Sequence, residues 1–270
     1  MPARLHAPTP ANLRRLAAAL RQGELVAIPT ETVYGLAAHA LDAKACRAIF
    51  RAKRRPANDP LIVHVLDLGH AEELADFNPA ARRLARRFWP GPLTLVLPKK
   101  ACVPDLVTSG QNTVAVRTSK DLVFTRIIRT FGKPLAAPSA NVFGSISPTS
   151  AGAVMAELNG RIPLIIDGGA CMFGLESTII KVEPDSPKPR ITILRPGPVT
   201  LDDLKKFGTV KLGYKPDKKI RHGQTEPPPE QPADNAAEEA AQDTAPADDE
   251  QPEDAPSPEQ ALQEMVVQAA

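Results

Sequence analysis

The order of apolar and polar positions first predicts an amphipathic helix at residues 11–22. Leucines at positions 13, 16 and 20 recur at the spacing of one helix face. Thr9 suits the N-cap, Pro10 the first helical position and Gly23 the position where the helix stops.

A short apolar run at residues 24–28 predicts a buried strand that ends at Pro29. The loop at residues 30–35 then follows a strand's carboxyl end, the edge at which open α/β sheets bind ligands. Asp42 is a candidate cap for a second helix that runs to about Lys53. A basic loop at residues 55–60 leads from this helix into an apolar strand at 61–65.

The rest of the pattern continues this mixture of helices and short strands. We expect helices at 79–88, 121–131 and 151–158 with a short one from 201, strands at 93–97, 113–117, 135–137 and 164–166, and a late β pair at 177–182 and 191–194. Because βα units alternate with adjacent strands, the predicted fold class is α/β: a twisted mixed parallel/antiparallel sheet with helices on its faces.

Charge divides the chain into three parts. Residues 226–270 contain no Lys or Arg but many Asp and Glu, Ala, Pro and Gln, a composition that cannot bury enough apolar surface to offset the entropy of ordering. We therefore expect a folded domain at 9–204, a basic linker at 205–225 and an acidic disordered tail at 226–270. The linker is either a solvated tether or a lid or tRNA-contacting segment.

The acidic tail hides a basic domain. The whole chain has 33 Lys and Arg against 31 Asp and Glu, yet every basic residue precedes position 226, which leaves that part near +15. A surplus of this size indicates an anionic ligand, either nucleotide phosphates or a nucleic-acid backbone.

Several classes of protein do not fit. The three cysteines lie far apart without a C-x-x-C pair, which favours a reducing compartment over a disulfide framework or zinc site. No apolar run reaches the ~20 residues of a membrane helix, and no signal peptide is evident, so a cytoplasmic location is expected. A P-loop and a G-x-G-x-x-G fingerprint are both absent.

Phosphates must then be held by other groups. Lys53 and Arg55 stand where a helix ends beside a strand, so a point charge and a planar guanidinium could converge on one anion; three consecutive bases are also typical of a solvated helix end. Ser139 and Asn141 follow a strand as the 30–35 loop does, and could bind phosphate or ribose or form a plain polar turn.

Other polar residues lie in or beside apolar strands. His64 is either a satisfied core histidine or a ligand for a carboxylate. Arg117 ends a strand and needs an anionic partner or solvent, so a structural salt bridge and a ligand contact both fit. Ser177 and Arg195 belong to the segments 176–178 and 194–197, which could equally be turns.

Taken in order, these segments resemble the threonylcarbamoyl-AMP synthases, whose domain is called YrdC-like. The resemblance covers about residues 13–204. It rests on PTETVYGL at 29–36, K-x-R at 53–55, PLIVH at 60–64, WPGPLT at 89–94, VAVR at 114–117, S-x-N at 139–141, EST at 176–178 and LRPG at 194–197.

The resemblance implies a nucleotidyltransferase that forms threonylcarbamoyl-AMP and pyrophosphate from L-threonine, bicarbonate or CO2, and ATP with Mg²⁺. A partner transferase complex would then modify tRNA. It also implies a basic concave surface on the mixed sheet. Longer members carry a second C-terminal domain, and this sequence is closer to the short form.

The resemblance also implies roles for individual residues. Lys53 and Arg55 would be catalytic. The nucleotide and its phosphates would be held by Lys53, Arg55, Ser139, Asn141 and Arg195. The threonine and carbamate pocket would be lined by Thr30, His64, Arg117 and Ser177. No protein ligand to the metal is expected, since Mg²⁺ would be held through the ATP phosphates.

Two alternatives remain at this stage. A basic concave face could bind tRNA or double-stranded RNA without catalysis, although few aromatic side chains are present for base stacking. A related carbamoyl-adenylate enzyme could use another acceptor.

Overall fold

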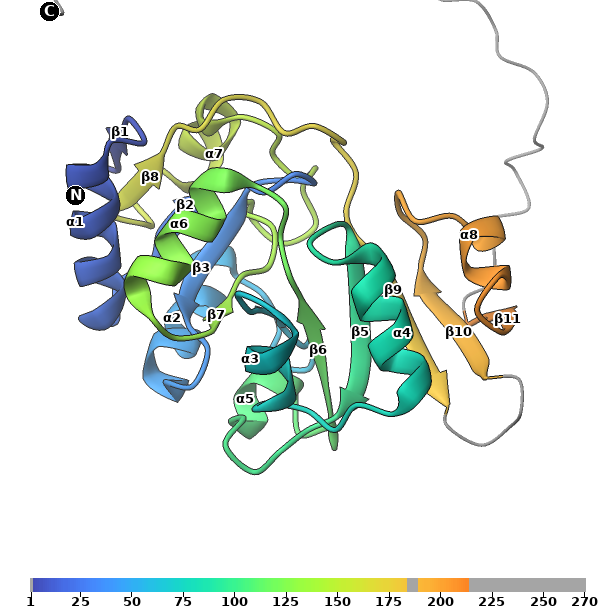
Figure 1. Ribbon diagram of the computed structural model, residues 1–270. Coiled ribbons are helices and arrows are strands. Elements are labelled where there is room, and N and C mark those ends of the chain that lie inside the picture. The colour runs from blue at the N-terminus through green and yellow to red at the C-terminus, as the bar shows by residue number, and fades with distance from the viewer. Residues whose placement is uncertain (1, 184–188, 214–270) are drawn as a thin grey trace, which may run out of the picture. The chain divides into compact units, whose positions relative to one another are not determined.

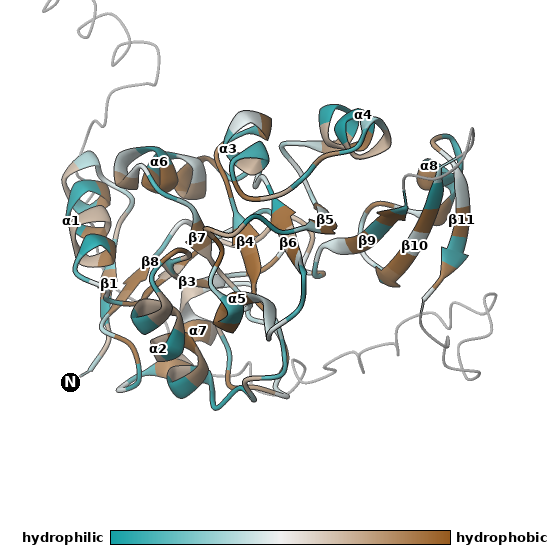
Figure 2. Ribbon diagram, turned by 90° about the horizontal axis from the view of Figure 1, so that it is seen from below, coloured by the Kyte–Doolittle hydropathy of each residue, from teal (hydrophilic) through white to brown (hydrophobic). Residues whose placement is uncertain are grey.

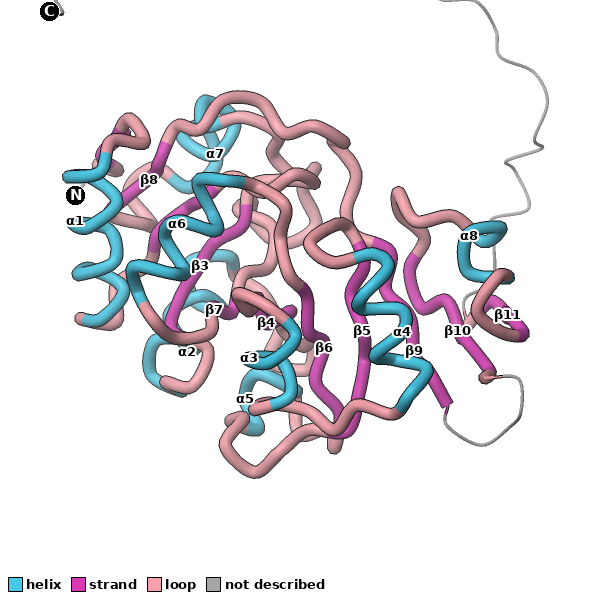
Figure 3. Tube along the Cα trace, in the orientation of Figure 1, coloured by secondary structure: helices cyan, strands magenta, loops and turns pink. Residues whose placement is uncertain are grey.

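The computed structural model describes residues 2–183 and 189–213 of the 270-residue chain. The strands are β1 (Arg4–His6), β2 (Val26–Ile28), β3 (Gly35–His39), β4 (Ile62–His64), β5 (Leu93–Pro98), β6 (Thr113–Arg117), β7 (Leu135–Ala136), β8 (Leu164–Ile166), β9 (Thr178–Glu183), β10 (Arg190–Arg195) and β11 (Thr209–Leu212). The helices are α1 (Pro10–Arg21), α2 (Ala43–Lys53), α3 (Leu68–Glu72), α4 (Pro79–Phe88), α5 (Asp105–Thr108), α6 (Leu122–Phe131), α7 (Ala151–Leu158) and α8 (Leu201–Lys205). Figure 1 shows their arrangement and Figure 3 separates them by type.

Local capping explains where the longer helices begin. The Thr9 side chain accepts from the third residue after it, and Pro10 occupies the first turn of α1. Asp42 accepts from two backbone amides of α2, and Ser150 accepts from one amide of α7. These caps satisfy amides that lack partners within the helix, which is why the predicted starts of these helices are confirmed.

The strands form one sheet in the order β1-β8-β2-β3-β7-β4-β6-β5-β9-β10-β11. Parallel pairs such as β4 with β6 and β5 with β9 alternate with antiparallel pairs such as β5 with β6 and β9 with β10. The predicted mixed α/β sheet is therefore confirmed, as is the late β pair.

Helices lie on both faces of the sheet. Figure 2 shows α1, α6, α3 and α4 along one face, with α2, α5 and α7 on the other. In β2, Val26 and Ile28 belong to the core formed with α1 and α6, whereas Ala27 belongs to the core that contains α2 and α7. Alternate side chains of β2 thus pack into two different hydrophobic cores.

The sheet extends beyond the predicted domain bounds of 9–204. β1 pairs in parallel with β8, and β11 pairs in parallel with β10 after the short helix α8. The first residues of the predicted linker therefore belong to the sheet, because Phe207 and Val210 pack against the core. The rest of the linker and the predicted tail, residues 214–270, lie outside the described residues. Within the described part of the chain, no helix has both the length and the apolar character that crossing a membrane requires.

Candidate active site

A cavity of about 470 Å³ opens over one face of the central strands. Ile62 and His64 of β4 line it, as do Thr113, Ala115 and Arg117 of β6. The intervening residues of both strands, such as Val63, are buried in the core on the opposite face. The period of two along each strand therefore separates cavity from core.

This position agrees in part with the expectation that Thr30 and Ser139 approach from one strand edge. β2 and β7 both run antiparallel to β3 and so point the same way, and the loops that follow them carry Thr30 and Ser139, which both line the cavity. β4 runs antiparallel to β7, so the ends of these neighbouring strands point in opposite directions. His64, at the end of β4, therefore lines the cavity from the face of the sheet rather than from that edge. The edge rule thus holds for β2 and β7 and does not extend to β4, which runs the other way.

Three arginines from distant segments line the cavity, and each contacts a carboxylate. Arg55 lies 2.9 Å from Asp59, and its Nε and Nη2 donate to the carbonyls of Asp59 and Pro60 at 3.0 and 2.8 Å. Arg117 lies 2.7 Å from Glu31, and Arg195 pairs with Glu176. The expected cationic hollow therefore carries its own counter-charges.

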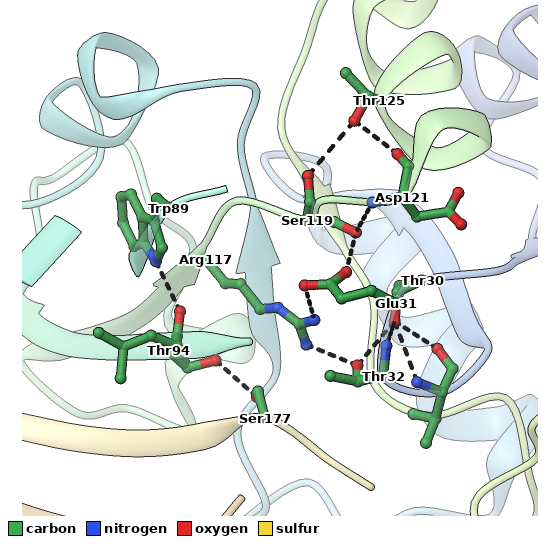
Figure 4. A network of polar contacts seen from close by, with 12 residues as sticks. Thr30, Glu31, Thr32, Trp89, Thr94, Arg117, Ser119, Asp121, Thr125 and Ser177 are labelled. Atoms are coloured by element: carbon green, nitrogen blue, oxygen red, sulfur yellow. Dashed lines mark hydrogen bonds and ion pairs between the residues drawn. The ribbon is translucent and has the colours of Figure 1, made fainter. Parts of the chain in front are cut away.

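Arg117 is held from two sides by the loop that follows β2 (Figure 4). Its Nη1 donates to the Thr32 hydroxyl at 3.0 Å, and Nη2 contacts the Glu31 carboxylate. The other oxygen of Glu31 accepts from Ser119 at 2.5 Å. All four side chains are buried, so this network fixes a guanidinium that has left water.

Thr30 organises the same loop while lining the cavity. Its hydroxyl accepts from the amides of Thr32 and Val33 and donates to the Val33 carbonyl at 2.7 Å. The Thr32 hydroxyl then donates to Thr30 at 2.8 Å. Arg117, Thr32 and Thr30 thus form a directed chain of donors.

Arg195 and Ser177 form the opposite wall. Arg195 donates from Nε to the Ser177 carbonyl at 3.1 Å and from Nη2 to its hydroxyl at 2.9 Å. The Ser177 hydroxyl also meets that of Thr94 at 2.8 Å. Burial lowers the pKa of Arg195 to about 10, with further lowering by the charges of Arg117 and Arg55. Arg195 is thus close enough to the other two guanidiniums to be repelled by them.

His64 is the polar group of the cavity that most clearly lacks a partner. It is 2% exposed, and neither ring nitrogen has a hydrogen-bond partner among the described residues. Its ring packs against Phe124 at 4.9 Å between centroids. Burial, and then the charge of Arg117, lowers the His64 pKa to about 3, so the ring is neutral at pH 7. The ring therefore lacks the partner that a satisfied core histidine has, and leaving such a buried polar group unpaired costs about 1–3 kcal/mol.

Lys53 and Asn141 differ from the expectation that both hold phosphates directly. Neither lines the cavity, whereas Arg55, Ser139 and Arg195 do. Lys53 is 1% exposed, and its ammonium donates to the backbone carbonyls of Ser139 and Asn141 at 2.5 and 2.7 Å. Arg54 adopts a left-handed conformation between Lys53 and Arg55, so the two cations turn in different directions.

Four site residues escaped the sequence reasoning: Glu31, Thr32, Asp59 and Glu176. Three of them are acidic, and an expected anion site gave no reason to assign carboxylates to it. The sequence did offer a signal for these acids, because a buried arginine requires a nearby carboxylate to balance its charge. Each acid lies within, or four residues from, a motif that was already under consideration.

Comparison with known proteins places this geometry in context. The Sua5/YciO/YrdC family model, described as "Telomere recombination", matches residues 18–197. Threonylcarbamoyl-AMP synthase of Pyrococcus abyssi is 48% identical over 202 residues, which cover 74% of this chain and 58% of that protein. The Bacillus subtilis protein of the same name is 45% identical over 197 residues, 71% of this chain and 55% of its own length. This chain therefore spans little more than half the length of these two relatives.

Solved structures agree with this comparison. P. abyssi Sua5 complexed with L-threonine has a TM-score of 0.73 at 43% identity, covering 77% of this chain and 63% of its own. Escherichia coli YciO has a TM-score of 0.65 at 21% identity and covers 76% of this chain and 99% of its own. The second likeness establishes the fold alone.

Proposed function

Because this chain belongs to the Sua5/YciO/YrdC family, we propose that it forms threonylcarbamoyl-AMP and pyrophosphate from L-threonine, bicarbonate or CO2, and ATP. The observation that carries the proposal is the cavity itself, which brings three guanidiniums, an unpartnered neutral imidazole and several hydroxyls to one hollow. This set matches substrates that bear a triphosphate, a carboxylate and a carbamate.

The reaction needs alignment and charge stabilisation. The threonine amine attacks the carbon of CO2 and loses a proton, which gives a carbamate. A carbamate oxygen then attacks the α-phosphorus of ATP, a new P–O bond forms, and the bond to the β-phosphate breaks as pyrophosphate leaves. The carbamate, the triphosphate and the pyrophosphate are all anionic, so fixed guanidiniums can act without a covalent enzyme intermediate.

Arg55 and Arg195 are placed to receive the phosphates. Each retains a carboxylate partner, so an incoming phosphate would share or displace Asp59 or Glu176. In Arg55 the Nη1 atom has no partner among the described residues, which leaves a donor for a phosphate oxygen. Ser139 also lines the cavity and supplies a hydroxyl.

Thr30, His64, Arg117 and Ser177 suit the threonine and carbamate end of the cavity. His64 serves there as a hydrogen-bond partner rather than as the base for the amine. Its pKa is about 3, whereas an α-amino group titrates near ~8. Proton transfer to His64 would therefore be uphill by several kcal/mol.

The donor set fits Mg²⁺ that is held through ATP. The carboxylates in the cavity lining, Asp59 and Glu176, already contact arginines, and hydroxyls are weak ligands by themselves. When bound, the ion would neutralise phosphate charge. We propose no protein side chain as its ligand.

The proposed product also implies a partner protein that consumes it. Threonylcarbamoyl-AMP is a mixed anhydride that a transferase complex would consume to modify tRNA. We place this reaction in the cytoplasm, which suits the three free cysteines. Binding of tRNA to the domain itself stays a prediction, as does the basic concave surface.

Mass spectrometry tests the proposal directly. The protein is incubated with ATP, Mg²⁺, bicarbonate and L-threonine, and the adenylate and pyrophosphate are measured. Omission of threonine or bicarbonate should abolish both, and serine or glycine in place of threonine should give little product. RNA affinity without turnover would support the non-catalytic alternative, and product with another amino acid would support a different acceptor.

A further inference from the structure

The turn at residues 139–145 forms part of the cavity wall, and Lys53 lies directly behind it. We propose that Lys53 is a positioning residue, whose ammonium clamps this turn and thereby sets the Ser139 hydroxyl and the Arg55 guanidinium at the cavity, without itself contacting phosphate. The role in the turn stands on its own, whereas the consequence for nucleotide binding rests on the proposed function.

The hydrogen bonds of Lys53 account for all of its protons. An ammonium has three N–H donors. Here it donates to the Ser139 carbonyl at 2.5 Å, the Asn141 carbonyl at 2.7 Å and the Asn141 side-chain oxygen at 3.2 Å. With a side chain that is 1% exposed, Lys53 has neither a free donor nor a path to the cavity.

The turn is bound to Lys53 through the backbone as well. The amide of Phe143 donates to the Lys53 carbonyl at 2.8 Å. The Asn141 amide group donates to the carbonyls of Val142 and Ser145 at 3.0 and 2.7 Å. Together with the bridge between Gly35 and Ser139 and the hydrogen bond from the Ala140 amide to the Tyr34 carbonyl, these contacts hold residues 139–145 around a single buried cation.

The same turn also reaches the phosphate-binding wall. The guanidinium of Arg55 lies over the Phe143 ring at 5.9 Å from its centroid. Ser139 lines the cavity, and its position follows from the carbonyl that Lys53 holds. Displacement of the turn would therefore move a hydroxyl and loosen an arginine together.

The charge of Lys53 is poised to change. Burial, and then the neighbouring charge of Arg55, lowers the Lys53 pKa to about 7, while Glu157 on α7 and Asp59 oppose the shift. Glu157 also accepts from the Val142 amide at 2.8 Å, so it braces the turn from the other side. Loss of one proton removes one of three donors, which should weaken the clamp without abolishing it.

Hydrogen exchange of the free protein tests the clamp apart from any activity. Lys53→Met removes all three donors, and Lys44→Met is the matched control because Lys44 is exposed on the same helix. Residues 139–147 should exchange roughly 10-fold faster or more in Lys53→Met, with no change in the control. Unchanged exchange would overturn the proposal.

A measurement on the unmodified protein covers the case in which Lys53→Met does not fold. After correction for intrinsic exchange rates, protection of residues 139–147 should fall about 3–10-fold as the pH rises from ~6 to ~9, centred near the Lys53 pKa. Helix α1 is the internal reference. A turn that keeps its protection across this range would contradict the clamp.

A double-mutant cycle distinguishes positioning from direct contact. The dissociation constant of Mg²⁺-ATP is measured for Lys53→Met, Ser139→Ala and the double variant. If Lys53 acts through the turn, the double variant should bind within about 2-fold of the weaker single variant. Losses that multiply would show that Lys53 meets the phosphates itself. If the protein binds ATP but forms no threonine-dependent product, the proposed function alone is overturned. If it does not bind ATP, the proposed effect of Lys53 on nucleotide binding is overturned, and the hydrogen-exchange results decide whether Lys53 holds the turn.

Discussion

Replacing Glu31 by Gln tests whether a buried charge pair holds Arg117. The two charged groups are 2.7 Å apart, and their side chains are only 3% and 4% exposed. With an effective dielectric constant of about 20, Coulomb's law gives roughly 6 kcal/mol at this distance before desolvation is subtracted. Removing one partner of a buried pair typically costs about 3–5 kcal/mol. Because Gln keeps an oxygen that can accept from Ser119, we expect a loss near the lower end, about 3 kcal/mol.

Urea denaturation measures this loss as a change in the free energy of unfolding. Glu183→Gln is the matched control, since its carboxylate is 31% exposed and lies 3.4 Å from Arg190. A pair so open to solvent should contribute no more than about 1 kcal/mol. If Glu31→Gln lost no more than this control, Arg117 would not depend on Glu31, and the reading of the network would be wrong.

Three further perturbations probe the cavity. Arg55→Ala should lower kcat/KM for ATP by about 10²–10³ while the circular dichroism spectrum stays native, because a charge contact in the transition state is lost. The control Arg126→Ala, at an exposed position, should leave kcat/KM unchanged. Equal kinetics of the two variants would show that Arg55 does not bind phosphate. His64→Gln should raise the KM for threonine and make the protein less sensitive to acid. In the wild type, the unfolded ring takes up a proton below its ordinary pKa of 6.5, but the folded ring does so only near 3, so wild-type stability falls as the pH drops through that window. Identical urea midpoints of the wild type at pH 7 and 5 would contradict this. Gly197→Ala should unfold or inactivate the protein, because the added Cβ would lie 2.4 Å from backbone atoms. As the control, Gly152→Ala places its Cβ near no close atom and should be neutral or stabilising by up to ~1 kcal/mol. A soluble, active Gly197→Ala protein would contradict this and show that the neighbouring segment can move aside.

Elements with local signals were the ones that could be predicted from sequence. α4 and β6 occur at the predicted bounds of 79–88 and 113–117. The strands β1, β3 and β11 were missed, as were the short helices α3 and α5. Gly and Ala, which make up much of β3, are depleted in strands, and the edge strands β1 and β11 are stabilised by the neighbours they pair with rather than by their own side chains.

The site shows the same division. Motifs identified Arg55, His64, Arg117 and Arg195 from residue type and order, and all four line one cavity. The acidic partners were missed. Glu31 and Glu176 gain their roles from arginines far away in the chain, whereas Asp59 is only four residues from Arg55 and carried a local signal.

Lys53 shows what residue type leaves open. It is two positions from Arg55, yet one side chain faces the core and the other the cavity. Lys53 is the last residue of α2, and the chain turns at Arg54 before Arg55 begins a new direction. Sequence could supply two cations, but only the path of the backbone after the helix separates them.

The sequence by itself determined the helix caps, the mixture of helices and strands, and the family to which the order of motifs points. These depend on neighbours within a few residues, or on similarity to other chains. Tertiary structure alone decided that His64 lines the cavity from the face of the sheet, that Arg117 and Arg195 each receive a carboxylate, and that His64 is left without a partner among the described residues. Such features arise from contacts between segments distant in sequence, and their free energies exist only once the sheet has brought those segments together.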